Sequence, residues 1–318
     1  MIGLEDIEAA REAIGSRLHR TPVVGSETLS KLTGARVFLK AELFQKTGSF
    51  KPRGVLTNLA ALGREERARG VIGISAGNHA QALAWGAAAE GIDALLVMWQ
   101  GASEAKIEAT HGYGAQVDLA SADPTEAFAR LDELVEESGR TLVHPFDHPL
   151  TMAGQGTVGL EVMEDVPDAS VVVVPVGGGG LISGVATAVK GIRPQARVIG
   201  IEPELSPALH DALAAGKSVP VSPRSVADGL GAPFAGEHCL RVCAERVDEV
   251  VLVSDEEIEE GMRFLYGRAK LACEPAGAAT TGALVAGKVL LEAGETVVAV
   301  VSGGNVAPET AVAILGAR

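Results

Sequence analysis

Aromatic residues are scarce in this chain of 318 residues, of which only 3% are Phe, Trp or Tyr. The core must therefore rest on the abundant Ala, Val, Leu and Ile side chains. No run of about 18 apolar residues occurs, so we expect no membrane-spanning helix and no membrane partner. The N-terminal stretch MIGLEDIEAAREAIG is acidic and amphipathic, unlike a signal peptide, which predicts a cytoplasmic protein.

Basic residues and cysteines are also few. Lys and Arg number 27 against 41 Asp and Glu, and the formal net charge of −14 argues against a nucleic-acid partner. The three cysteines, Cys239, Cys243 and Cys273, are too few for a disulfide framework. Cys239 and Cys243 lie one helical turn apart. We expect them to be small buried hydrophobes, because His238 alone cannot complete a zinc site.

Short β-branched runs alternate with longer Ala-, Leu- and Glu-rich segments throughout the chain. This alternation predicts an α/β fold whose parallel sheets are covered by helices on both faces. The expected strands are 36–41, 70–75, 94–99, 116–120, 141–145, 171–176, 198–201, 250–253 and 297–301. The expected helices include 126–138, 181–191 and 256–271, and Ser254 with Glu257 forms a capping box before the last of them.

Three of the expected strands end in glycine-rich turns, at 75–79, 177–180 and 302–305. Ligands of parallel sheets bind beyond the carboxyl ends of strands, where glycine lets the backbone approach them and helix N-termini favour anions. Four consecutive glycines between an apolar strand and a helix therefore predict a phosphate site. A tight turn without any ligand is the simpler alternative.

A dinucleotide site is a competing interpretation of the tetraglycine turn. Glu202 follows about 20 residues later, at the end of the next expected strand, where a ribose-binding carboxylate would lie. However, Ser183 stands in place of the third glycine of that fingerprint. A P-loop is excluded because no Gly-Lys-Ser/Thr follows the glycines.

Lys51 is the candidate nucleophile of the chain. It follows Phe50 and a Thr-Gly-Ser turn at the expected start of a helix. A lysine that is buried or at a helix N-terminus has the lowered pKa that Schiff-base chemistry requires. Lys46 is the nearest competitor, and spacing alone does not choose between them. Either lysine could also be an ordinary solvated charge.

Together these segments resemble the threonine dehydratase and serine racemase branch of the fold type II pyridoxal phosphate (PLP) enzymes. The matching motifs, in order, are SFKPRG at 49–54, SAGNHA at 75–80, GGGGL at 177–181, ADG at 227–229, EPAGA at 274–278 and SGGN at 302–305. The resemblance implies two domains like those of the tryptophan synthase β-subunit, each an open, mostly parallel twisted sheet with helices on both faces. Residues 1–52 and 146–318 would form the large cofactor-binding domain. Residues 53–145 would form a small domain that closes over the substrate.

The resemblance also implies which residues hold the cofactor. Lys51 would bind PLP as a Schiff base, while Phe50 and Gly229 would pack against the two faces of the pyridine ring. Asn78 would bond the 3-oxygen of the ring, and Ser302 would face the ring nitrogen. The backbone N–H groups of one loop would hold the phosphate, and its residues are Gly177, Gly178, Gly179, Gly180 and Leu181.

A second loop is implied to receive the carboxylate of a small amino-acid substrate. Its residues are Ser75, Ala76, Gly77, Asn78 and His79. Within it we expect His79 to hold the loop by a hydrogen bond. Racemases of this branch carry a second serine where this chain has Ala76. A methyl group cannot transfer a proton, so elimination is favoured over racemisation.

The implied reaction is the β-elimination of L-threonine or L-serine to a 2-oxo acid and ammonia. The neutral hydroxyl of Ser302 would not enforce protonation of the ring nitrogen, which favours expulsion of a leaving group at Cβ. Lys51 would remove the α-proton as a general base. A 3-hydroxyaspartate dehydratase is an alternative that an extra basic residue in the pocket would indicate. A nucleotide-binding regulatory module, which would not need Lys51, is the alternative from another class.

Two acidic residues have open roles. Glu202 matches a ligand for the structural divalent cation, Mg²⁺ or Ca²⁺, that many relatives bind through oxygen. Ala208 occupies the position of the next acidic ligand, so a plain strand-end charge is the alternative. Glu274 is either an acid near the cofactor or a carboxylate at the N-terminus of a helix that begins with Pro275. Symmetric assembly as a homodimer or homotetramer is expected.

Overall fold

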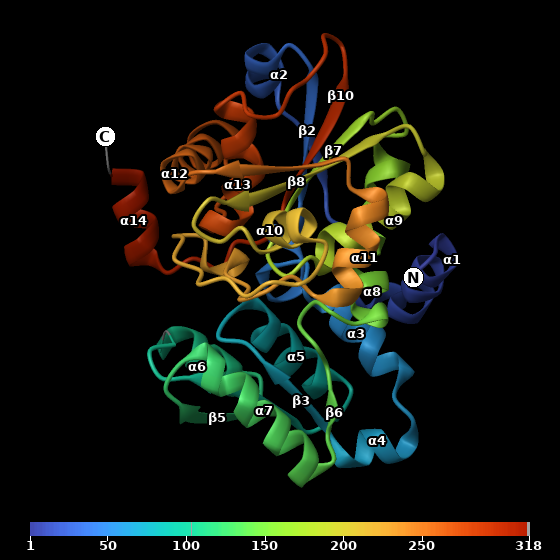
Figure 1. Cartoon of the computed structure of the whole chain (residues 1–318), viewed down its shortest axis with the longest axis vertical. Coiled ribbons are helices and arrows are strands. Elements are labelled where there is room, and N and C mark those ends of the chain that lie inside the picture. The colour runs from blue at the N-terminus through green and yellow to red at the C-terminus, as the bar shows by residue number, and fades with distance from the viewer. Residues whose placement is uncertain (103, 317–318) are drawn as a thin grey trace.

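The computed structural model describes residues 1–102 and 104–316, and its strands form two separate sheets (Figure 1). The strands of the larger sheet, in spatial order, are β1 (Val23–Gly25), β2 (Arg36–Ala41), β10 (Thr296–Val301), β7 (Val171–Pro175), β8 (Arg197–Pro203) and β9 (Glu249–Val253). Those of the smaller sheet are β5 (Gln116–Ser121), β4 (Ala94–Trp99), β3 (Val71–Ile74) and β6 (Thr141–Leu142). Neighbouring strands are parallel except β1, which runs antiparallel to β2.

The middle strands of the larger sheet are buried on both faces. Alternate side chains of β7 enter two different cores, Val171 and Val173 on one side and Val172 and Val174 on the other. A continuous run of β-branched residues suits such a strand, because both faces need apolar side chains. Helices therefore cover both faces of this sheet, as Figure 1 shows.

One core lies beneath four helices of the larger sheet, α2 (Glu27–Thr33), α12 (Asp255–Phe264), α13 (Pro275–Val285) and α14 (Pro308–Gly316). The opposite core lies beneath α8 (Pro149–Asp165), α9 (Gly180–Ile192), α10 (Ala208–Ala215) and α11 (Glu237–Arg246), with α1 (Leu4–Ile14) packed on α8. The smaller sheet is covered by α3 (Pro52–Ala61) and α5 (Asn78–Ala89) on one face and by α7 (Pro124–Ser138) on the other. Two further helices, α4 (Arg64–Arg69) and α6 (Glu104–Gly112), belong to the same part of the chain.

All nine expected strands are present, with shifts at their ends. The largest differences are the strand expected at 141–145, of which only β6 forms, and the helix expected at 256–271. That helix ends at Phe264 and continues as a π-helical turn, Leu265–Ala269. The capping box of Ser254 and Glu257 is confirmed at the start of α12.

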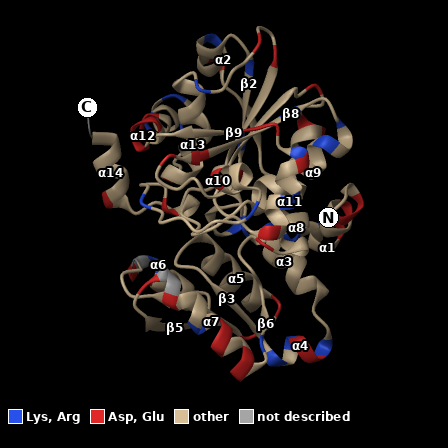
Figure 2. Cartoon of the chain, in the orientation of Figure 1, with Lys and Arg blue, Asp and Glu red and all other residues tan. Residues whose placement is uncertain are grey.

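Charged residues lie mainly on the outer helices and in the loops, whereas the strands of the larger sheet are largely uncharged (Figure 2). Within the described ranges, no helix is both long and apolar enough to cross a bilayer.

Candidate active site

A cavity of about 490 Å³ opens between the two sheets. The ends of β3 and β4 line it from the smaller sheet, and the residues after β7 and β10 line it from the larger one. It therefore lies where parallel sheets bind ligands. Its lining includes every residue expected to bind cofactor or substrate, namely Phe50, Lys51, Ser75, Ala76, Gly77, Asn78, His79, Gly177, Gly178, Gly179, Gly180, Leu181, Gly229 and Ser302.

Lys51 precedes the first residue of α3, Pro52, as the sequence predicts. Its Nζ donates a hydrogen bond to the carbonyl oxygen of Pro145 at 2.9 Å and lies 5.2 Å from the ring centroid of Phe50. Burial lowers the pKa of Lys51 to about 8, because desolvation disfavours the charged amine. Lys51 lines the cavity and Lys46 does not, which favours Lys51 as the nucleophile.

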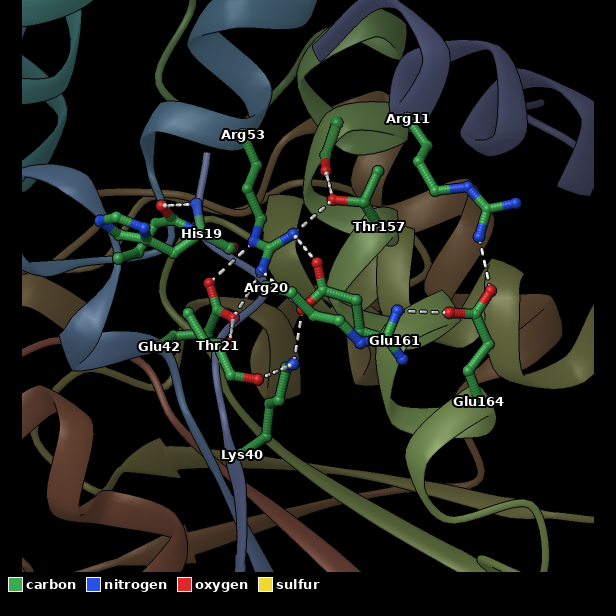
Figure 3. A network of polar contacts seen from close by, with 12 residues as sticks. Arg11, His19, Arg20, Thr21, Lys40, Glu42, Arg53, Thr157, Glu161 and Glu164 are labelled. Carbon is green, nitrogen blue, oxygen red and sulfur yellow. Dashed lines mark hydrogen bonds and ion pairs between the residues drawn. The ribbon is translucent and has the colours of Figure 1, made fainter. Parts of the chain in front are cut away.

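A buried network of charges anchors the chain just after Lys51 (Figure 3). The guanidinium of Arg53 bonds both carboxylate oxygens of Glu42 and both of Glu161, at 2.8–2.9 Å. Lys40 Nζ donates to the same Glu161 at 2.5 Å and to the carbonyl oxygen of Thr21 at 2.8 Å. Burial would raise the pKa of Glu161, but Arg53 and Lys40 outweigh it and hold that pKa below its usual range. The network ties the start of α3 to β2 and α8.

The tetraglycine turn leaves no room for side chains. Gly179 has φ of +96°, and a Cβ there would lie 2.8 Å from Cβ of Cys239. A Cβ on Gly178 would lie 2.4 Å from the ring of Phe146. Because α9 begins at Gly180, the backbone N–H groups of its first turn have no partner within the helix and are available to an anion. The turn is thus a backbone cradle suited to a phosphate group.

Gly179→Ala should weaken cofactor retention by about 10-fold or more, since a residue held in a strained conformation costs about 1–3 kcal/mol and the cradle would have to move to admit the methyl group. Equilibrium dialysis of the purified protein against PLP measures the change. Gly216→Ala is the matched control, because Gly216 also has positive φ (+67°) but lies at the end of α10 with open space around its Cβ position. Equal retention of PLP by the two variants would contradict the assignment of the tetraglycine turn as the phosphate site.

His79 holds the loop expected to receive the substrate carboxylate. Its Nε2 lies 2.8 Å from the carbonyl oxygen of Val143, so this nitrogen must carry the proton. Burial, reinforced by the nearby Lys51, lowers the pKa of His79 to about 3 and keeps the ring neutral. The hydrogen bond expected from the sequence is thereby confirmed.

Glu274 faces the cavity rather than its own helix. Glu274 immediately precedes Pro275, the first residue of α13, so its expected position at a helix N-terminus is confirmed, although its side chain makes no capping bond to that helix. Instead its Oε1 accepts a hydrogen bond from Nδ2 of Asn78 at 2.7 Å. Burial raises the pKa of Glu274 to about 7. This supports the interpretation as an acid beside the ligand site.

The outer wall of the cavity contains Asp228 of the ADG motif and three residues that the sequence analysis did not single out, Lys106, Trp99 and Phe128. Lys106 of α6 reaches across to form an ion pair with Asp228, beside Gly229, and both residues line the cavity. The aromatic side chains of Trp99 and Phe128 also line it. No local sequence signal marks Lys106, because its contribution depends on how α6 lies against the larger sheet.

Glu202 lies apart from this cavity, buried at the end of β8. Both of its carboxylate oxygens accept backbone N–H groups from the start of α10, those of Leu209 and His210, each at 2.8 Å. Burial raises its pKa to about 8. In the described part of the chain, no group of three or more His, Cys, Asp or Glu side chains is arranged to hold a metal ion. The divalent cation at Glu202 stays a prediction.

Comparison with known proteins connects this geometry to a family. A family model described as pyridoxal-phosphate-dependent enzyme matches residues 15–303. The chain belongs to that family. An L-threonine ammonia-lyase from Thermotoga maritima is 44% identical over 307 residues, which cover 96% of this chain and 76% of the relative.

Solved structures of the family share the fold. Maize serine racemase superposes with a TM-score of 0.93 at 36% identity, covering 97% of this chain and 95% of that one. The processed form of a threonine deaminase from Solanum lycopersicum superposes with a TM-score of 0.90 at 33% identity, covering 98% and 91%. The α/β architecture of two mostly parallel sheets is thus the fold type II architecture that the motifs indicated.

Proposed function

We propose that this enzyme is a PLP-dependent lyase that converts L-threonine, and also L-serine, to a 2-oxo acid and ammonia. The observation that carries the proposal is the convergence of the buried amine of Lys51 and the tetraglycine cradle in one cavity. The relatives named as a threonine ammonia-lyase and a threonine deaminase support it.

The residues around the cavity fit PLP. We assign its phosphate to the backbone N–H groups of 177–181, its ring to the space between Phe50 and Gly229, and its ring nitrogen to the hydroxyl of Ser302. When bound, PLP withdraws electrons from the substrate and so acidifies the Cα–H bond. A neutral hydroxyl at Ser302 accepts or donates a hydrogen bond without forcing a charge on the ring nitrogen.

Lys51 serves as the base in this proposal. With a pKa near 8, a substantial fraction of the freed amine is neutral near physiological pH, so it can take the α-proton of the substrate. The N–H groups at the start of α5 and in the loop 75–79 hold the substrate carboxylate. With the Cα–H and Cβ–O bonds broken, the β-hydroxyl would depart with a proton as water, and the enamine product would tautomerise and hydrolyse to the 2-oxo acid and ammonia.

The outer residues of the cavity favour substrates with one carboxylate. Lys106 could attract the second carboxylate of 3-hydroxyaspartate, but its charge is already engaged by Asp228. Ala76 offers no proton to the opposite face of the substrate, which disfavours racemisation. We therefore place L-threonine and L-serine ahead of 3-hydroxyaspartate.

The proposal also extends to the domain division, the localisation and the assembly of the enzyme. We assign 1–52 and 146–318 to a cofactor domain and 53–145 to a domain that closes over the substrate. All strands of the smaller sheet fall between Val71 and Leu142, which supports this division. We also expect a cytoplasmic homodimer or homotetramer, since symmetric assembly is usual for such enzymes.

The proposal is tested by the visible absorption spectrum of the PLP-loaded protein before and after addition of L-threonine, with 2-oxobutanoate and ammonia measured in parallel. A band that changes on addition, with equal amounts of the two products, is expected. A band that ignores threonine but responds to 3-hydroxyaspartate would move the assignment to that substrate. Failure to take up PLP at all would remove the lyase assignment.

The pH dependence of cofactor uptake should reveal the lowered pKa of Lys51. Only the neutral amine attacks the aldehyde of PLP, so the uptake rate should rise with pH and level off above pH about 8. An ordinary lysine would continue to gain rate up to pH about 10. Stopped-flow absorbance on mixing cofactor-free protein with PLP measures the uptake rate at each pH. Lysine with its α-amino and carboxyl groups blocked, so that only the side-chain amine reacts, is the control in solution. A rate that kept rising past pH about 9 would show a solvated Lys51.

A further inference from the structure

A chain of side-chain hydrogen bonds connects three loops around the cavity. Asn305, after β10, donates from its Nδ2 to the carbonyl oxygen of Thr47 and to Oδ1 of Asn78, both at 2.7 Å. Asn78, the first residue of α5, donates from its own Nδ2 to Oε1 of Glu274, also at 2.7 Å. Asn78 and Glu274 line the cavity, whereas Asn305 is not among its lining residues.

The series of hydrogen bonds begins at the carbonyl oxygen of Thr47, which can only accept a hydrogen bond. The atom of Asn305 that faces Thr47 must therefore be its N–H₂ group. The second proton of that group then requires an acceptor, which is the amide oxygen of Asn78. With its oxygen committed, the amide of Asn78 must present its N–H₂ side to the cavity and to Glu274. One backbone carbonyl thus determines which end of a cavity amide faces a ligand.

The backbone is shaped to permit this chain. Thr47 is one of only two non-glycine residues with positive φ in the described ranges, at 59°. A Cβ on Gly48 would lie 2.3 Å from Oδ1 of Asn305, and one on Gly303 would lie 2.2 Å from Oε1 of Glu274. The two loops also bond directly, since the N–H of Gly304 donates to the carbonyl oxygen of Gly48 at 2.9 Å. Residues with positive φ, or glycines with no room for a Cβ, therefore lie at both ends of this series of hydrogen bonds.

We propose that Asn305 is a positioning residue that holds the amide of Asn78 with its N–H side toward the cofactor. The inference rests on the proposed function. Glu274 takes one proton of the Asn78 amide, and the other remains for an acceptor in the cavity. The anionic 3-oxygen of the bound pyridine ring is such an acceptor. A reversed amide would instead turn its oxygen toward that anion and toward the carboxylate of Glu274.

Asn305→Asp tests the relay, because a carboxylate cannot donate to Thr47 or to Asn78. The charged side chain would attract the N–H₂ group of Asn78 and reverse its amide. We expect the visible band of the PLP-loaded variant to move to shorter wavelength. We also expect kcat for L-threonine to fall about 10- to 100-fold, the range for loss of a charged hydrogen bond, with KM nearly unchanged. Asn305→Ala removes the bond to Asn78 without reversing its amide. This variant should show a smaller shift of the visible band and a smaller fall in kcat.

Asn58→Asp is the matched control for loss of stability. Asn58 is also buried and donates from one Nδ2 to two oxygens, those of Gly54 and the Thr151 hydroxyl, at 2.8 and 2.9 Å. It does not line the cavity, so its variant should lower the melting temperature but retain the wild-type band. Wild-type band and kcat in Asn305→Asp would overturn the relay while leaving the lyase assignment intact. Absence of any PLP band in the wild type would instead overturn the proposed function, and the relay with it.

Discussion

Replacing Lys51 by alanine should lower the rate of L-threonine elimination by a factor on the order of 10³ or more, since the variant lacks both the covalent attachment point and the base. The cavity itself should persist, because within the described part of the chain the Lys51 side chain makes a single hydrogen bond, to Pro145. PLP would then bind through its phosphate and ring alone. The measurement is kcat for 2-oxobutanoate formation, together with the absorption spectrum, which should lack the Schiff-base band.

Lys46→Ala provides the control for this prediction. Lys46 belongs to the same loop but lies outside the cavity lining, so its loss should change kcat by less than a few fold. A Lys51→Ala variant that retained the Schiff-base band would show that another amine holds the cofactor. Loss of the band in Lys46→Ala alone would exchange the roles of the two lysines.

Replacing Arg53 by methionine should reduce the free energy of unfolding by about 3–5 kcal/mol, the usual cost of removing one partner from a buried ion pair. Two carboxylates, Glu42 and Glu161, would lose their principal cation while remaining in the interior. Lys40 bonds only the second of them, so Glu42 would have to take up a proton or admit water. Urea unfolding of the cofactor-free protein, extrapolated linearly to water, measures the change.

An exposed ion pair supplies the matched comparison. Arg36 pairs with Asp168 at the surface, where both side chains are more than half exposed. Arg36→Met should therefore cost less than about 1 kcal/mol. Equal effects of the two arginine substitutions would mean that the buried network of Figure 3 contributes little to the stability of the fold.

The elements that sequence reasoning recovered are those with a strong local cause. The strands at 36–41 and 94–99 match β2 and β4 at both ends, and apolar β-branched runs explain the buried strands. The motifs located the cavity, and in two of them the local backbone explains the glycine or proline. Lys51 before Pro52 and the tetraglycine turn before α9 are of this kind.

The features that sequence reasoning missed depend on contacts between distant segments. β1 is only three residues long and exists because Val23, Val24 and Gly25 pair with β2. The bond from Asn78 to Glu274 spans 196 positions, and that from Asn305 to Thr47 spans 258. No local sequence pattern predicts either hydrogen bond. The same holds for Lys106 and Asp228, which are 122 positions apart.

The central place of β10 has a consequence for the order in which the nascent chain can fold. β10 lies between β2 and β7, yet it is the last of the described strands to leave the ribosome. All strands of the smaller sheet are made before residue 143, so that sheet can assemble while the larger one still has a vacant central position. Until Thr296–Val301 is synthesised, β2 and β7 each expose an unpaired edge of the kind that invites association between chains. Newly made chains should therefore depend most on protection from aggregation just before this strand emerges.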